Sequence, residues 1–375
     1  MCAIMDYKLS AIIIYIQKGD NMELQVIKTQ NPKQIPDYNN LGFGKYFTDH
    51  MFMMTYTEGI GWHDAKICEY GPIPMQPGAQ VFHYGQATFE GMKAYRDQND
   101  KITLFRPLDN FNRMNRSNDR LCMPHIDPEW VLGVLEQLLL IEKEWIPNLP
   151  GTSLYIRPFM IASESSLGVK VASEYIFMII LSPVGSYYAE GLQPTSIYVE
   201  DSYVRAMDGG TGEAKCAGNY ATSLLPYKKA KEMGYSQVLF LDGKEKKYVE
   251  EVGTSNAFFV IDGKLYTSPL KGTILPGITR DSIIKVARMK GYEVVEEALA
   301  IDYIFDIAKQ GKLDESFASG TAAVISPIGK LSYKDDVIVI NNNEIGAIAQ
   351  ELYDTLTGIQ TGKLDDPFNW VHHVN

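Results

Sequence analysis

Apolar and polar positions in the first half of the chain follow both the two-residue period of strands and the longer period of helices. Apolar runs bounded by turn residues predict strands at 47–57, 91–95, 102–105, 153–161 and 175–183. Helical spacing predicts a short turn at 84–89, a helix capped by Asp109, and a second helix that begins at Asp127-Pro128 and ends before Pro147. This mixture of strands and helices indicates an α+β arrangement.

The second half opens with a strand predicted at 196–200 and continues with strands in pairs. Gln237–Leu241 is expected to turn at Asp242-Gly243, and Asn256–Ile261 at Asp262-Gly263. Helices are expected at 217–234, 279–290, 302–310 and 344–356. Short strands with Asp-Gly turns favour a mixed or antiparallel sheet over a doubly wound parallel one.

The length of 375 residues allows two domains, each with its own core. A stretch that contains glycine and proline predicts a linker at 185–194. We therefore expect a smaller domain at 22–184 and a larger one at 195–375. Residues 1–21 are expected to be an extension, upstream of a start at Met22, that lies outside the fold.

The composition argues against several functional classes. Apolar residues make up 45% and charged residues 22% of the chain, as in an ordinary soluble globular protein. The net charge of −11, without a basic block, argues against nucleic-acid binding. The apolar run at 11–16 is too short to cross a membrane and is not followed by a signal cleavage site, so we expect a cytoplasmic protein. The four cysteines and six histidines show no ligand spacing that would predict a metal site.

The strongest chemical signal lies at Gly209–Tyr220, where three glycines in four positions precede Lys215. Glycines let the backbone come close to a ligand. A lysine amine has an ordinary pKa of about 10.4, and a desolvated amine with a lowered pKa can form a Schiff base with a carbonyl. A surface lysine is the commoner interpretation of such a residue. A dinucleotide fingerprint is incomplete here because Lys215 occupies the position of the third glycine.

Two segments of the second half could act together with Lys215. Glu250–Asn256 contains the acidic group that a pyridoxal phosphate ring requires at its pyridine nitrogen. Leu275–Asp281 contains a glycine followed by Thr279, a good N-cap whose helix would offer free amides to an anion. Each segment taken alone is equally typical of a plain turn or helix start.

Small residues and arginines complete the group of residues that could act together with Lys215. The amides of Ser319–Ala323 could converge on a phosphate or a carboxylate. Arg113 and Arg157 could grip either anion bidentately, although a solvated or salt-bridged arginine is commoner. An amine, a carboxylate, an anion cradle and arginine clamps together favour pyridoxal phosphate over most other cofactors.

At these residues the chain resembles the branched-chain amino acid aminotransferases, a group within the fold-type IV pyridoxal phosphate enzymes. The likeness runs from about Gly42 to the end of the chain. The segments that carry it are Phe47–Met51, Phe89–Ala94, Leu104–Pro107, Gly218–Tyr220, Glu251–Thr254 and Ile274–Gly277. The resemblance implies a two-domain mixed α and β fold, similar to that of D-amino acid aminotransferase, with a smaller N-terminal domain and a larger cofactor-binding C-terminal domain.

The resemblance also implies roles for single residues. Lys215 would hold pyridoxal 5'-phosphate covalently and move the proton between the substrate Cα and the cofactor C4′. Glu251 would bind the pyridine nitrogen and Tyr220 the ring hydroxyl. The phosphate ligands would be Arg113, Ile278, Thr279 and Thr321, with Ile278 and Thr279 acting through backbone amides. The substrate pocket would be lined by Phe43, Tyr84, Phe89, Tyr155, Tyr187, Thr254, Ser255 and Ala322.

The implied reaction is a transamination. A branched-chain amino acid (leucine, isoleucine or valine) would give its amino group to the cofactor, and 2-oxoglutarate would collect it. Arg157 matches the position where the family handles the second carboxylate of glutamate. Leu167 and Val169 match a loop that the family lends to the neighbouring subunit, which implies a homodimer.

Three alternatives to this function differ in their sequence support. Two are other fold-type IV enzymes, a D-amino acid aminotransferase or an aminodeoxychorismate lyase, and the segments Phe47–Met51 and Phe89–Ala94 favour the branched-chain group over them. The third is a binding protein without catalysis, which the presence of Lys215, Glu251 and Arg113 argues against. One departure from the family's animal members is Ala323–Ser326, which replaces a Cys-x-x-Cys redox pair.

Overall fold

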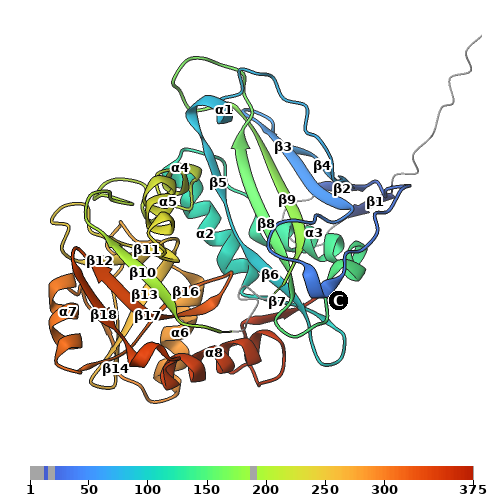
Figure 1. Ribbon diagram of the computed structural model, residues 1–375. Coiled ribbons are helices and arrows are strands. Elements are labelled where there is room, and N and C mark those ends of the chain that lie inside the picture. The colour runs from blue at the N-terminus through green and yellow to red at the C-terminus, as the bar shows by residue number, and fades with distance from the viewer. Residues whose placement is uncertain (1–11, 16–21, 186–191, 375) are drawn as a thin grey trace, which may run out of the picture. The chain divides into compact units, whose positions relative to one another are not determined.

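The computed structural model describes residues 12–15, 22–185 and 192–374 (Figure 1). Contacts within the chain divide it into two units. Unit 1 consists of Met1–Arg96, Phe111–Gly185 and His373–Asn375, and unit 2 of Asp97–Asn110 and Ser186–His372. The division at residue 185 falls where the linker was expected to begin. Asp97–Asn110, however, belongs to unit 2, because Phe105 packs edge-on against Trp370 within the apolar core of that unit.

Unit 1 is built on a largely antiparallel sheet. Its strands run in the order β1-β2-β4-β3-β9-β8-β6, with β5 paired to β8, and only β2 and β4 are parallel. The strands are β1 Ile12–Tyr15, β2 Glu23–Val26, β3 His50–Thr57, β4 Gly61–Glu69, β5 Ala87–Phe89, β6 Met92–Arg96, β8 Ser153–Ala162 and β9 Glu174–Val184. Every strand predicted between 47 and 183 is present, and 102–105 forms β7 Ile102–Phe105, whose residues belong to unit 2.

Strand β1 lies within the stretch that was expected to be outside the fold. Residues 12–15 pair with β2 in antiparallel register, from Ile12 opposite Val26 to Tyr15 opposite Glu23. Isoleucine favours strands, and β2 offers an edge to which a further strand can add. Four residues of the expected extension therefore extend the sheet.

Helix α3, Pro128–Ile141, begins where it was predicted. The side chain of Asp127 accepts hydrogen bonds from the amides of Glu129 (2.9 Å) and Trp130 (3.1 Å), and Pro128 takes the first helical position. The helix buries an apolar stripe, and Trp130 meets Phe52 of β3 with ring centroids 6.1 Å apart. The N-cap and the apolar stripe together fix α3 on this sheet.

Two other local predictions in the first half were wrong. The helical turn expected at 84–89 is helix α1, Val81–Tyr84, which Gly85 ends in the left-handed conformation (φ +64°), and 87–89 forms β5. Helix α2, Pro107–Arg120, begins two residues before Asp109. Asp109 instead accepts a hydrogen bond from Arg106 Nε at 2.6 Å, in the first turn.

Unit 2 contains a mixed sheet, as the short strands and Asp-Gly turns predicted. The strand order is β12-β11-β10-β17-β16-β13-β14-β15, with β18 paired to β17 and an additional pairing between β12 and β13. β10 is parallel to both β11 and β17, and β14 is parallel to β15. The strands are β10 Thr195–Glu200, β11 Gln237–Leu241, β12 Val249–Val252, β13 Ser255–Ile261, β14 Lys264–Thr267, β15 Val294–Glu296, β16 Leu313–Gly320, β17 Val324–Tyr333 and β18 Asp336–Val339.

Helices cover both faces of this sheet. Alternate residues of β13 face opposite cores: Phe259 packs with helix α7, Ile301–Lys309, whereas Phe258 packs with α6, Ile278–Met289, and α8, Ala347–Gln360. The near-continuous burial of β13 follows from this three-layer arrangement.

Turn chemistry explains the hairpin between β13 and β14. Ile261 pairs with Lys264 across a two-residue turn in which Asp262 (φ +48°) and Gly263 (φ +73°) are both left-handed. This is a type I′ turn, which the Asp-Gly sequence favours. The second predicted turn is longer, because Asp242 accepts hydrogen bonds from four backbone amides up to Tyr248 before β12 begins.

Two helix predictions in unit 2 depart from the structure by more than one residue. The segment 217–234 forms α4, Ala217–Ala221, and α5, Leu224–Glu232, because Pro226 has no amide to bond the carbonyl four residues before it. Helix α8 begins three residues later than expected. Glu315 of β16 accepts hydrogen bonds from the amides of Ile348 and Ala349, both at 2.9 Å, and thereby fixes its first turn.

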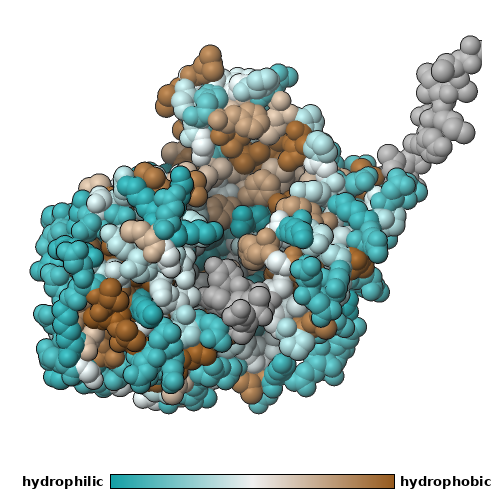
Figure 2. Space-filling model, in the orientation of Figure 1, coloured by the Kyte–Doolittle hydropathy of each residue, from teal (hydrophilic) through white to brown (hydrophobic). Residues whose placement is uncertain are grey.

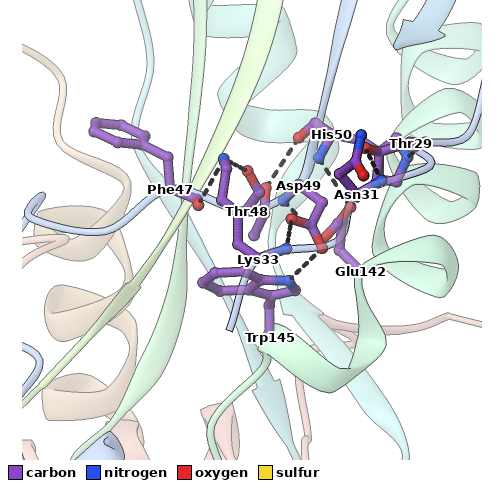
Figure 3. Close-up of polar contacts among 9 residues, drawn as sticks. All are labelled: Thr29, Asn31, Lys33, Phe47, Thr48, Asp49, His50, Glu142 and Trp145. Atoms are coloured by element: carbon purple, nitrogen blue, oxygen red, sulfur yellow. Dashed lines mark hydrogen bonds and ion pairs between the residues drawn. The ribbon is translucent and has the colours of Figure 1, made fainter. Parts of the chain in front are cut away.

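A buried polar network in unit 1 anchors the start of β3 (Figure 3). Glu142, which is 2% exposed, accepts hydrogen bonds from the amides of Asp49 (3.3 Å) and His50 (3.0 Å) and from Nδ1 of His50. On the other side of the ring, Nε2 of His50 accepts from the amide of Thr29 at 2.8 Å. These partners assign the neutral tautomer of His50 with its hydrogen on Nδ1.

Asp49 extends this network to a second backbone segment. Its carboxylate accepts from the amide of Lys33 at 2.8 Å and from Nε1 of Trp145 at 3.3 Å. Lys33 Nζ in turn donates to the carbonyls of Phe47 (3.4 Å) and Thr48 (2.8 Å) (Figure 3). The Phe47–Met51 segment is therefore part of the scaffold of unit 1.

We predict that Glu142→Ala lowers the free energy of unfolding by about 3–5 kcal/mol, because it leaves three donors of Asp49 and His50 without their buried acceptor. Urea denaturation would measure the loss. The control is Glu144→Ala, whose side chain is 69% exposed and should change stability by about 0.5 kcal/mol or less. Equal stability of the two variants would contradict this account of the network.

Candidate active site

Close packing shapes the glycine loop before Lys215. A Cβ atom added to Gly212 would lie 2.2 Å from the carbonyl oxygen of Thr273 and 2.6 Å from Cβ of Ala206, so only glycine fits there. Asn219 holds the loop from the far side, with its Nδ2 donating to the carbonyls of Thr211 (2.7 Å) and Ala214 (2.8 Å). The loop is therefore packed on two sides and Lys215 is half-buried, in contrast to the surface lysine that was the alternative interpretation.

Lys215 points its amine at a phenol. Its Nζ donates a hydrogen bond to the hydroxyl of Tyr220 at 2.9 Å, and both side chains are half-buried. Cys216 is buried at the N-cap of α4, which agrees with its interpretation as a packing residue. The amine that the sequence singled out is thus held in place by a tyrosine five residues further along the chain.

Glu251 lies on β12 and is 2% exposed. Its Oε2 forms an ion pair with Arg205 at 2.7 Å, and its Oε1 accepts from Nδ2 of Asn256 at 3.0 Å. Burial raises the pKa of Glu251 to about 7, and the guanidinium of Arg205 and the amine of Lys215 oppose that rise. A small cavity is lined by both Tyr220 and Glu251. This carboxyl group can therefore share a proton with a basic ring nitrogen at neutral pH.

The first turn of α6 offers backbone amides to an anion. Its N-cap is Gly277, so Thr279 is the second helical residue and the prediction that it is the N-cap was wrong. No side chain caps this turn within the described residues. The amides of Ile278 and Thr279 therefore lie at an uncapped helix N-terminus, the kind of site that binds phosphate.

Strand register brings the remaining predicted residues of unit 2 to one end of its sheet. Asn256 of β13 lies opposite both Glu251 of β12 and Ser319 of β16. The turns that follow these positions therefore end at the same edge. These turns and the strand residues next to them carry Thr254, Ser255, Thr321 and Ala322, and a Cβ on Gly320 would lie 3.0 Å from Oγ of Ser255.

In unit 1, Arg157 of β8 lies among aromatic rings. Its guanidinium carbon is 4.8 Å from the ring centroid of Phe89 and 5.3 Å from that of Tyr155, whose hydroxyl accepts from Nη2 at 3.1 Å. The buried Nε of Arg157 has no hydrogen-bond partner among the described residues. Phe43 meets Tyr155 edge-on at 5.0 Å. The structure thus brings Phe43, Phe89, Tyr155 and Arg157 together.

Lys93 of β6 pairs in register with Tyr155, so its side chain is on the same face of the sheet. Desolvation lowers the pKa of Lys93 to about 8. Gly91 makes room for the phenol, because a Cβ there would lie 2.1 Å from the hydroxyl oxygen of Tyr155. This face therefore carries a second cation close to Arg157.

Arg113 is 3% exposed and is held by a carboxylate that the sequence analysis did not single out. Its Nε and Nη2 each lie 2.7 Å from an oxygen of Glu90, in a bidentate pair. Tyr84 donates to the carbonyl of Leu167 at 2.5 Å, in the β8–β9 loop that also carries Val169. Tyr187 lies outside the described residues.

Sequence reasoning missed several residues that hold the site. Glu90, Lys93 and Asn219 all lie within the segments Phe89–Ala94 and Gly218–Tyr220, so those segments were an available signal. Asn256 follows Glu251 by five residues but carries no local signal of its partnership. Arg205 carries no local sequence signal either, because it meets Glu251 only in the folded chain.

Neither a membrane span nor a metal centre is found in the described parts of the chain. No helix there is long and apolar enough to cross a bilayer. The described residues also contain no group of three or more His, Cys, Asp or Glu side chains that could hold a metal ion.

Comparison with known proteins adds independent findings. A family model for class IV amino-transferases matches residues 87–331. Branched-chain-amino-acid aminotransferase 2 of Bacillus subtilis is 54% identical over 353 residues, which are 94% of this chain and 97% of that protein. Branched-chain-amino-acid aminotransferase of Mycolicibacterium smegmatis is 45% identical over 90% of this chain and 93% of its own length.

Solved structures are similar as well. The branched-chain amino acid aminotransferase of Escherichia coli superposes with a TM-score of 0.72 at 27% identity, covering 86% of this chain and 99% of that one. The T.th. enzyme of the same name, complexed with N-(5'-phosphopyridoxyl)-L-glutamate, gives a TM-score of 0.71 at 25% identity and covers 86% and 98%.

We predict that Gly212→Ala lowers the free energy of unfolding by about 1–3 kcal/mol, because the new methyl group overlaps the Thr273 carbonyl. The matched control is Gly218→Ala in helix α4, where a Cβ would meet no described atom within 4 Å. That variant should be neutral or stabilised by up to about 1 kcal/mol. Chemical denaturation of both proteins tests this, and an unaffected Gly212→Ala protein would show that the loop has room.

Proposed function

This chain belongs to the branched-chain-amino-acid aminotransferases of the class IV family, and we propose on that premise that it moves the amino group of L-leucine, L-isoleucine or L-valine to 2-oxoglutarate. The products are a branched-chain 2-oxo acid and L-glutamate. The relatives' names support this reaction over that of a D-amino acid aminotransferase or a lyase. The observation that carries the choice of substrates is the placement of Arg157 among aromatic rings.

The protein is a pyridoxal phosphate enzyme, and the residues of unit 2 fit this cofactor. Lys215 supplies an amine for the covalent link, and the Tyr220 hydroxyl, 2.9 Å from that amine, suits the ring hydroxyl. The buried Glu251 supplies an acid for the pyridine nitrogen. When bound, the cofactor supplies an electron sink for the electrons of the Cα–H bond.

Lys215 has a second role in the proposed reaction. Its amine would also move a proton, taking it from the substrate Cα, while the bound cofactor would supply the electron sink. The hydrogen bond from Nζ to Tyr220 keeps the amine near its working position. The same lysine thereby acts as the covalent anchor and as the general base.

Glu251 serves as the counter-ion of the ring. A carboxylate that is buried and bound by Arg205 cannot reorient freely, so it presents a fixed negative charge to the pyridine nitrogen. A protonated nitrogen next to that charge makes the ring a better electron acceptor. Burial raises the pKa of Glu251 to about 7, and the guanidinium of Arg205 and the amine of Lys215 oppose that rise and favour the ionised form.

The phosphate is assigned to two kinds of donor. Ile278 and Thr279 offer the amides of an uncapped helix start, and Thr321 lies in the turn between β16 and β17. Arg113 is the proposed charged ligand, with its guanidinium held in orientation by Glu90. Backbone donors and arginine are the usual partners of phosphate.

Arg157 lets one pocket accept two unlike side chains. The faces of Phe89 and Tyr155 present apolar surface that suits the branched side chain of leucine, isoleucine or valine. The same rings hold the guanidinium of Arg157, which is the proposed partner of the second carboxylate of glutamate. Without such a cation, burial of that carboxylate would be costly.

We also propose that the protein is a cytoplasmic homodimer. Leu167 and Val169 in the loop between β8 and β9 are 82% and 86% exposed, and Val171 is 58% exposed. Figure 2 shows hydrophobic surface at the top of the view, where Figure 1 places this loop and α1. An exposed apolar cluster of this kind is typical of a surface that a partner covers.

We predict that borohydride reduction of the holoenzyme attaches the pyridoxyl group to Lys215, and that Lys215→Ala abolishes the attachment. No other residue assigned to the cofactor has an amine for the covalent link. Peptide mapping by mass spectrometry locates the label. Lys93 is the internal control, since its lowered pKa also makes it a candidate nucleophile, and a label on Lys93 would overturn the assignment.

We predict that Arg157→Met slows the half-reaction with glutamate much more than the half-reaction with leucine. The expected gap is that of a charge-assisted hydrogen bond, roughly 1.5–3 kcal/mol or ten- to a hundredfold in rate. Single-turnover measurements with each amino acid would determine it. Arg157→Lys, which keeps the charge and loses the planar fork, should fall between the two proteins. Equal losses for both amino acids would make Arg157 a structural residue.

A further inference from the structure

We propose that Asn256 is a positioning residue that fixes the carboxylate of Glu251 and the first turn of α6 in one arrangement, so that the ring and the phosphate of the cofactor are gripped together. The proposal rests on the assignment of this cofactor to Glu251, Ile278 and Thr279. Asn256 acts through these residues and does not itself contact substrate or cofactor.

The amide nitrogen of Asn256 donates two hydrogen bonds, to two different segments of the chain. Its Nδ2 donates to Oε1 of Glu251 at 3.0 Å and to the carbonyl oxygen of Leu275 at 3.1 Å. A primary amide has two hydrogens on its nitrogen, so these bonds use its whole donor capacity. The side chain is 5% exposed, and both bonds are therefore shielded from water.

The oxygen of the same amide packs against the N-cap of α6. A Cβ atom added to Gly277 would lie 2.1 Å from Oδ1 of Asn256. The amide thus contacts the turn at Leu275 through its nitrogen and at Gly277 through its oxygen. Because Ile278 and Thr279 follow directly, any rotation of this amide would disturb the backbone that presents their amides.

Arg205 also links Glu251 to the segment before α6, but it does so through an ion pair instead of an amide hydrogen bond. Oε2 of Glu251 pairs with Arg205 at 2.7 Å, and Arg205 also donates to the carbonyl of Thr273. Each oxygen of the carboxylate is thus tied to the segment before α6 by one side chain. Arg205 adds a positive charge, which favours the ionised acid, whereas Asn256 adds none. We assign the orientation of the carboxylate to Asn256 and the balance of its charge mainly to Arg205.

The register of the sheet makes this position specific for asparagine. Asn256 lies between Glu251 and Ser319 on neighbouring strands, so its side chain is confined on both sides. Alanine there would remove the Asn256 donor from the Leu275 carbonyl and from Oε1 of Glu251. Aspartate would keep the shape but place a second negative charge against Glu251.

The test compares Asn256→Ala with Ser316→Ala in the apoprotein. Ser316 is also buried in this sheet and donates a hydrogen bond to the carbonyl of Phe258 at 3.1 Å, without touching the site. Titration with pyridoxal 5'-phosphate, followed by absorbance, gives the dissociation constant. We expect a roughly ten- to hundredfold weaker affinity for Asn256→Ala and an unchanged one for Ser316→Ala. Equal affinities of the two variants would overturn the proposal.

A double-mutant cycle distinguishes an effect of Asn256 that acts through Glu251 from a general destabilisation of the site. If Asn256 acts through Glu251, the losses of Asn256→Ala and Glu251→Gln are not additive, and the double variant binds little worse than Glu251→Gln alone. Fully additive losses would refute that route.

Should the Asn256→Ala protein fail to fold, Asn256→Asp serves in its place. We expect it to bind the cofactor more weakly than wild type at neutral pH and to recover at acid pH as a carboxyl is protonated, and no recovery would count against the proposal.

A third measurement addresses the phosphate end. Inorganic phosphate should compete with the cofactor less effectively in Asn256→Ala than in wild type, because the first turn of α6 is no longer held. Competition that is unchanged would limit Asn256 to the ring and contradict the coupling. None of these measurements uses an amino acid, so a wild-type protein that fails to transaminate leucine would refute the proposed function and leave this inference standing.

Discussion

A carboxylate buried between two neighbouring strands of a sheet is the constraint on which unit 2 depends. Glu251 can remain there only if its charge is balanced and its oxygens are hydrogen-bonded, since an isolated buried charge is very costly. Arg205 and Asn256 meet these needs, and each also holds a carbonyl of the segment before α6. The close approach of Gly212 to Thr273 packs the lysine loop against that same segment. The acid, the amine and the anion-binding helix start are therefore consequences of one packing arrangement.

The constraint in unit 1 is different. A cation must be able to bind a carboxylate while the surface around it stays apolar. Arg157 lies against Phe89 and Tyr155, and stacking on aromatic faces stabilises a guanidinium while leaving its edge able to donate hydrogen bonds. An ammonium group in the same place would be more strongly hydrated and less compatible with apolar neighbours. This difference explains how one surface serves both an aliphatic chain and a carboxylate in the proposed reaction.

Much of this could be read from local sequence. Asp127-Pro128 began a helix because the cap and the proline act within one turn, and Asp262-Gly263 formed a type I′ turn because both residues tolerate positive φ. The segments around Lys215 and Glu251 indicated the family and its cofactor. The paired short strands also predicted the mixed sheet of unit 2. In each case the deciding interaction spans only a few residues.

Only the tertiary structure decided features whose partners are distant in the chain. Helix α8 starts where Glu315 of another strand binds its amides, and Thr279 is not an N-cap because the turn at Leu275–Gly277 is packed against Asn256. Arg205 has no local pattern that marks it, yet it neutralises Glu251 across 46 positions (251 − 205). The sequence thus determined the elements and the reactive groups. Their hydrogen-bond partners, and hence their orientation and pKa, were settled by long-range packing, which a local pattern does not encode.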